Sequence, residues 1–180
     1  MNRYLALTHS GTGEWTVWEP RLPGCEYIVG CDPSLGRVGT RGDHSCAHVA
    51  KRHPGRRVEQ VAELYVRWPI GRVGEALACI ATYYQDDDGQ PAIVNIERNL
   101  ADAAVVAMEY QGFPRERFFV ERRLKSIANT INTDFFVQKH AHNQRALTDA
   151  LHDYLDRDAY VIRSARTIDE IESLERNDRG

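Results

Sequence analysis

The sequence predicts an α/β domain in which a mixed β-sheet carries helices on both faces. Three observations lead to this class. Residues 26–68 contain three strand-like runs joined by short turns, as in an antiparallel meander. Helix-period segments then alternate with short apolar runs, which is typical of strands that return to a sheet in parallel. The 180 residues and 42% hydrophobic content are enough to bury a substantial core.

The N-terminal residues 1–25 are predicted to form an irregular arm, because glycine and proline punctuate them. Within the arm, Trp15-Thr16-Val17-Trp18 is either a short strand or a pair of aromatic anchors. Residues 26–180 form the main domain. Its first three strands are predicted at Glu26–Asp32, His44–Lys51 and Arg57–Trp68.

The rest of the chain is predicted to alternate helices with short strands. In order, we expect a helix from Val73 to Tyr84, a strand at Ala92–Glu97, a helix at Asn99–Gln111, a strand at Arg117–Val120, a polar connection at Glu121–Ala141, a helix over Ala146–Leu155, a strand at Ala159–Arg163 and a helix from Thr167. The predicted sheet therefore has five main strands, a three-strand antiparallel meander plus two parallel strands. This is the ribonuclease H-like layout, in which the first and fourth strands end side by side.

Two carboxylates stand at those two strand ends. Asp32 ends the first run and Glu97 ends the fourth, so the layout predicts that they face each other. Paired carboxylates bind divalent cations such as Mg²⁺ or Mn²⁺, and cations held in this way cleave phosphodiesters. Asp43 is a further candidate ligand, because a hairpin can return it to the same edge. The alternative is that these are ordinary surface carboxylates at strand ends and turns.

Three groups of residues resemble one known family. They are Trp18-Glu19-Pro20 before Tyr27-Ile28-Val29-Gly30-Cys31-Asp32-Pro33, then Gly42-Asp43-His44-Ser45, then Ile96-Glu97-Arg98-Asn99. Together they are similar to the nuclease domain of phage terminase large subunits, and the similarity extends over nearly all of residues 15–175. The chain departs from the family in lacking its usual glycine after Ile-Glu-Arg-Asn. The family's third acidic element is also apparently missing, with only Asp178 near its place. A nucleotide-binding G-x-x-x-x-G-K-[ST] loop is absent.

The resemblance implies a metal-dependent endonuclease that cuts double-stranded DNA concatemers by two-metal hydrolysis during viral DNA packaging. Asp32 and Glu97 would be its catalytic metal ligands. The implied partners are double-stranded DNA, an ATPase motor domain, the portal and the small terminase subunit. The implied location is the cytoplasm of an infected bacterial host, with no membrane contact. With only two secure acids, we expect the isolated chain to cleave weakly or not at all.

Nucleic-acid binding would require local basic patches, because the net charge is −3. The clearest patch follows the second predicted helix and consists of Arg115, Arg117, Arg122, Arg123 and Lys125. A solvated charged surface is the alternative interpretation. Cys46 is interpreted as a small core residue, and no cysteine spacing indicates a zinc site. His44 and His48 share one strand face and are predicted to be packed or partly exposed.

Three other functions remain open at this stage. The first is a non-catalytic or truncated docking module on the same fold. The second is a junction-resolving nuclease. The third is a sugar-kinase-like or actin-like nucleotide site, in which Asp32 and the glycines after it would contact phosphate.

Overall fold

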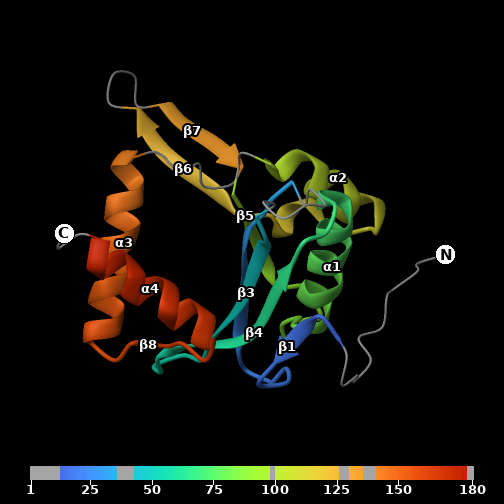
Figure 1. Cartoon of the computed structure of the whole chain (residues 1–180). Helices are drawn as coiled ribbons and strands as arrows, with labels where there is room; N and C mark the ends of the chain where they lie inside the picture. Colours follow the sequence, from blue (N-terminus) through green and yellow to red (C-terminus); the bar gives the residue numbers. More distant parts are fainter. Residues whose placement is uncertain (1–12, 36–42, 98–99, 126–129, 136–140, 178–180) are drawn as a thin grey trace.

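The computed structural model describes residues 13–35, 43–97, 100–125, 130–135 and 141–177. Its main sheet has the strand order β1-β4-β3-β2-β5, and β8 pairs with β4 (Figure 1). Its strands are β1 (Trp15–Val17), β2 (Glu26–Asp32), β3 (Ser45–Arg52), β4 (Val58–Val66), β5 (Ile93–Ile96) and β8 (Tyr160–Val161). A separate two-stranded sheet consists of β6 (Val120–Lys125) and β7 (Thr130–Phe135).

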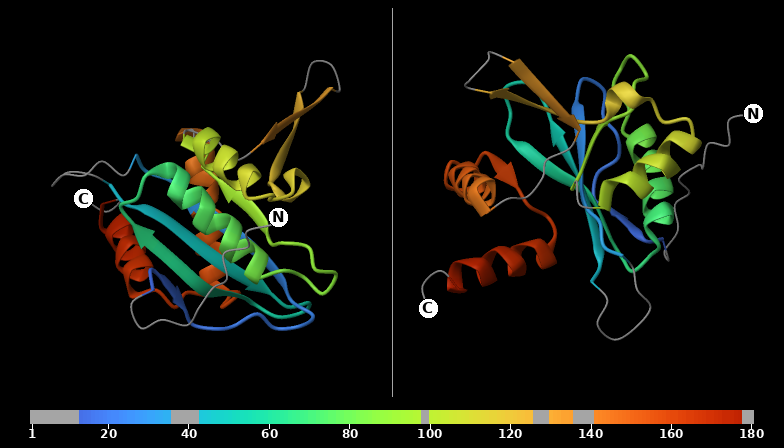
Figure 2. Two further views of the ribbon diagram at one scale, coloured as in Figure 1. Left: turned by 90° about the vertical axis from the view of Figure 1, so that its right-hand side faces the viewer. Right: turned by 90° about the horizontal axis from the view of Figure 1, so that it is seen from above.

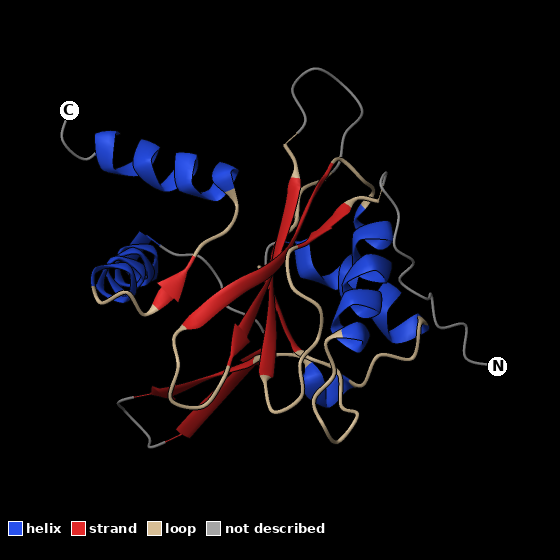
Figure 3. Cartoon of the chain, turned by 90° about the horizontal axis from the view of Figure 1, so that it is seen from below, coloured by secondary structure: helices blue, strands red, loops and turns tan. Residues whose placement is uncertain are grey.

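The predicted meander and its parallel neighbour are confirmed. Strands β2, β3 and β4 pair antiparallel in sequence order, and β5 pairs in parallel with β2. The main helices are α1 (Ile70–Tyr83), α2 (Ala101–Tyr110), α3 (Ala141–Asp156) and α4 (Ala165–Asn177). Figures 2 and 3 show α1 and α2 on one side of the sheet and α3 and α4 on the other. The chain therefore has the predicted α/β fold, in a ribonuclease H-like arrangement.

The core lies between the sheet and the first two helices. Along β2, Tyr27, Val29 and Cys31 are buried, while the residues between them face the other side of the sheet. Helix α1 buries apolar residues at helical spacing against this face, among them Val73, Leu77 and Ile80. Gly74 allows the backbones of α1 and α2 to touch, because a Cβ atom there would lie 2.4 Å from the carbonyl oxygen of Ala104.

A cluster of charges closes the end of the sheet where β3 ends and β4 begins. The buried Lys51 ammonium contacts Glu19 at 2.5 Å and Glu59 at 3.6 Å, and Arg163 donates to Glu59 at 2.8 Å. Burial would raise the pKa of Glu59, but the Arg163 hydrogen bond and the Lys51 charge hold that pKa below its ordinary value. These pairs tie the N-terminal arm and the segment before α4 to the sheet.

Three predicted elements need correction. The strand expected at Arg117–Val120 is reduced to a single bridge between Val94 and Phe118, because a 3₁₀ turn occupies Arg115–Arg117. The polar connection expected at Glu121–Ala141 instead contains the β6–β7 hairpin, whose strands alternate polar and apolar residues too weakly to be recognised. Helix α4 begins at Ala165, before the predicted start at Thr167, because Ser164 caps it. The Ser164 hydroxyl accepts from the Thr167 N–H at 3.2 Å.

Candidate functional site

The ends of β2 and β5 place the two predicted acids next to each other. Cys31 pairs with Ile96 in the parallel register, and the Glu97 N–H donates to the Cys31 carbonyl at 2.8 Å. Asp32 and Glu97 are therefore the next opposed pair along the two strands. Side chains alternate between faces, so both point away from the face covered by α1 and α2. Asp32 is exposed and Glu97 is partly exposed.

Asp43 lies at the same end of the sheet. The Ser34 hydroxyl donates to the Asp43 carbonyl at 2.6 Å, and the Ser34 N–H donates to the Ser45 hydroxyl at 2.9 Å. These bonds hold the segment before β3 alongside the segment after Asp32. The Asp43 side chain is exposed there, at the edge where a hairpin was expected to return it.

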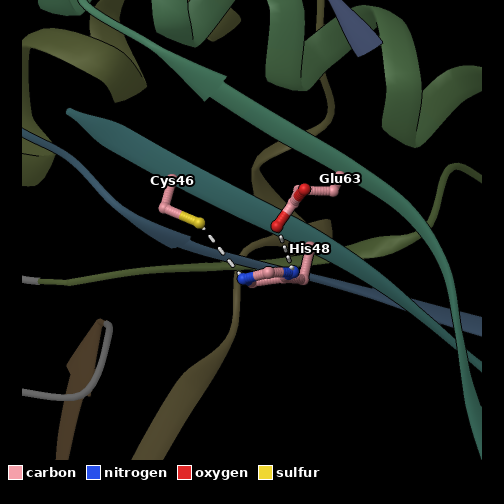
Figure 4. Close-up of side chains that lie close together, drawn as sticks. All are labelled: Cys46, His48 and Glu63. Atoms are coloured by element: carbon pink, nitrogen blue, oxygen red, sulfur yellow. Dashed lines mark hydrogen bonds and ion pairs between the residues drawn. The ribbon is translucent and has the colours of Figure 1, made fainter. Parts of the chain in front are cut away.

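A second polar group occupies the same face of the sheet, on β3 and β4 (Figure 4). Cys46 and His48 are two residues apart on β3, and His48 is paired directly with Glu63 on β4. The Cys46 sulfur lies 3.1 Å from His48 Nε2, and a Glu63 oxygen lies 4.0 Å from His48 Nδ1. In the described part of the chain, this is the one set of three such side chains whose ligand atoms all lie within 4.8 Å of one another.

Hydrogen bonding around Gln60 determines how this group is protonated. The Gln60 carbonyl oxygen accepts from the N–H groups of Arg163 and Ser164, each at 2.9 Å. Its amide nitrogen therefore faces His48 Nδ1 and donates to it. The proton of neutral His48 must then sit on Nε2, where it points at the Cys46 sulfur. Burial lowers the pKa of His48 despite the opposing charge of Glu63, which favours this neutral form.

Glu63 is already engaged by the start of α4. The Ser164 hydroxyl donates to one Glu63 oxygen at 2.6 Å, and Arg166 contacts the other at 3.2 Å. Burial raises the pKa of the Cys46 thiol to about 12, so the sulfur is protonated near neutral pH. The structure thus uses these side chains as a hydrogen-bonded latch between β3, β4 and α4. We call Cys46, His48, Gln60, Glu63 and Ser164 the polar latch.

The two groups differ in their fitness for a metal ion. Carboxylates on adjacent strand ends, such as Asp32 and Glu97, offer the hard oxygen ligands that Mg²⁺ and Mn²⁺ prefer. In the polar latch, a metal would have to displace the proton on His48 Nε2 and the proton on Cys46. The acid pair is therefore the better candidate for a metal centre.

The basic residues predicted to contact DNA are only partly described. The Arg117 guanidinium donates to the Pro91 carbonyl at 2.5 Å and lies 3.6 Å from Asp86, so it ties together two loops. Arg115 is exposed, 3.8 Å from Glu109. The backbones of Arg122, Arg123 and Lys125 belong to β6, but their side chains lie outside the described part of the structure, as does Asp178.

Sequence reasoning missed the polar latch. A Cys-x-His spacing on a strand does place both side chains on one face, but Glu63 joins them only through the β3–β4 register. Gln60 and Ser164 are separated by about a hundred residues and meet only in the folded chain. A cavity of about 350 Å³ opens elsewhere, between α1 and the segment that follows α2, and none of the predicted acids lines it.

No protein-family model matches the chain, and no curated protein sequence is detectably similar to it. Within the described ranges, no helix is both long and apolar enough to cross a lipid bilayer.

Proposed function

We propose that this chain is the metal-dependent endonuclease domain of a viral DNA-packaging terminase. The observation that carries the proposal is the placement of Asp32 and Glu97 on adjacent parallel strand ends, in a sheet of ribonuclease H-like order. The motifs around Asp32, Asp43 and Glu97 that resemble phage terminase nucleases support the same assignment. The fold alone serves many functions, so the assignment depends on the acids.

The proposal gives each acidic residue a role in metal binding. Asp32 and Glu97 hold a divalent cation between two strand ends, and a strand scaffold fixes their spacing better than a loop would. Asp43, from the segment before β3, would add a further oxygen ligand. When bound, Mg²⁺ or Mn²⁺ supplies an activated water and stabilises the leaving oxygen of a phosphodiester. The substrate is double-stranded DNA. An ATPase motor domain, the portal and the small terminase subunit are the partners of this proposal.

The first experiment is a calorimetric titration of the whole chain with Mn²⁺. We expect binding that is lost in Asp32→Ala and in Glu97→Gln but kept in Asp149→Asn, which removes an exposed charge on α3. Plasmid cleavage in Mn²⁺ should likewise be lost in Asp32→Ala and in Glu97→Gln and kept in Asp149→Asn. Circular dichroism of each variant checks that the fold is intact.

Three results would count against the proposal. Mn²⁺ binding that survives both Asp32→Ala and Glu97→Gln would place any metal elsewhere. Absence of Mn²⁺ binding in the wild type would favour a docking module on the same fold. Cleavage confined to four-way junctions would instead favour a junction-resolving nuclease.

A further inference from the structure

Three parallel-running strands deliver their last residues to one end of the sheet. Strands β2 and β4 both run antiparallel to β3, and β5 runs parallel to β2. Asp32 ends β2, Glu97 follows β5, and Arg67 follows β4. The arginine therefore comes to the same end of the sheet as the two acids, although no sequence motif links it to them.

The register across the sheet sets the spacing. Asp32 is paired with Cys46, and Cys46 is paired with Tyr65 on the next strand. Adjacent strands lie about 4.8 Å apart, so Tyr65 is about 10 Å from Asp32 across the sheet. That distance corresponds to about three base pairs along a DNA duplex.

Tyr65 organises a basic group at this position. The His44 ring stacks on the Tyr65 ring with centroids 4.1 Å apart, and the Arg166 guanidinium lies 3.7 Å from the centroid of the same ring. Partial burial, followed by the charges of Arg67 and Arg166, lowers the pKa of His44. Both guanidinium groups therefore lie near one imidazole, against the opposing charge of Asp43.

Arg67 is the member of this group available to a ligand. It is exposed, and no ion-pair partner for it is found among the residues that the structure describes. Arg166, by contrast, is anchored to Glu63 at 3.2 Å. Along β4, Glu63 and Tyr65 point to the face that carries the acids, while Leu64 and Val66 are buried in the core. The same alternation assigns Arg67 to the acid-bearing face.

We propose that Arg67, flanked by His44 and by Arg166 on Tyr65, contacts the DNA phosphates next to those held at Asp32 and Glu97. This inference rests on the proposed nuclease function and names a substrate contact for it. A planar guanidinium donates two parallel hydrogen bonds to a phosphate, and such contacts position a duplex without selecting its sequence. The contact lies on the β4 side of the acids, whereas the basic residues from 115 to 125 follow the β5 edge.

The test measures duplex binding by fluorescence anisotropy with a short fluorescein-labelled DNA, in EDTA so that metal-dependent cleavage does not consume the probe. Arg67→Ala should weaken binding several-fold, and Arg67→Glu should weaken it more. Across a salt series, the slope of log K against log salt should become shallower by about 0.9 for Arg67→Ala. Arg56→Ala is the matched control, because Arg56 is also exposed but lies in the β3–β4 turn at the opposite end of the sheet.

The outcomes separate this inference from the function on which it rests. If the wild type binds and cuts DNA and Arg67→Ala leaves affinity and salt slope the same as in Arg56→Ala, the Arg67 contact is wrong and the nuclease stands. If Asp32→Ala abolishes cleavage while Arg67→Ala changes only binding, both hold. If the wild type binds no duplex at any salt concentration, both are overturned.

Discussion

The close contact between α1 and α2 at Gly74 can be tested by substitution. Substituting Gly74→Ala would place a methyl group 2.4 Å from the Ala104 carbonyl oxygen and 2.9 Å from its Cα. Both are backbone atoms, so α2 itself must shift. Overpacking of this kind costs about 1–3 kcal/mol, while alanine gains about 1 kcal/mol over glycine in a helix. The difference is a net loss of up to about 2 kcal/mol.

Gly71 provides the matched control, because it lies in the same helix and a Cβ atom there meets nothing within 4 Å. Gly71→Ala should stabilise the protein by up to about 1 kcal/mol. Urea unfolding of both variants and the wild type measures the difference, and thermal unfolding should shift by about 2–4 °C for each kcal/mol. If Gly74→Ala were as stable as Gly71→Ala, the close approach of the two helices would be refuted.

Three further predictions concern the polar latch. Glu63→Gln should lower the free energy of unfolding by about 1–2 kcal/mol, because the carboxylate is buried and accepts from Ser164, while Glu75→Gln on the exposed face of α1 should change little in the same urea titration. The pKa of His48 is lowered in the folded chain, so on acidification the unfolded chain protonates His48 first. The free energy of unfolding should therefore hold above about pH 6.5 and fall below it. An equal fall in His48→Gln would contradict this prediction. The Cys46 thiol, with its pKa raised to about 12, should react with iodoacetamide far more slowly at pH 8 in the folded chain than in urea. Peptide mass spectrometry measures the two rates, and equal rates would contradict the prediction.

The fold class could be predicted because its determinants are local. Period-2 alternation in residues 26–68 and helical spacing from Val73 define elements without reference to distant residues. The short links between the first three strands allow little besides a meander. The β6–β7 hairpin was missed because its pairing depends on register rather than on a strong apolar pattern.

The candidate site could also be predicted in part from local sequence. An acid at the end of each of two strands can be found in the sequence, and strand order alone brings Asp32 beside Glu97. The start of α4 was predicted too late for a different reason. Ser164 caps this helix because Gln60 and Glu63 on β4 hold Ser164 in place, and neither is near it in the sequence.

The sequence by itself therefore determined the three-strand meander, the strand before Glu97, the main helices and the two acids, because each is encoded by neighbouring residues. The tertiary structure alone decided which side chains from different strands meet and which nitrogen of His48 carries its proton. His48 meets Glu63 through strand register, and Gln60 sets the tautomer of His48 only because backbone groups about a hundred residues away orient its amide. Arg67 joins the acids for the same reason, since parallel strands bring residues far apart in sequence to one end of a sheet.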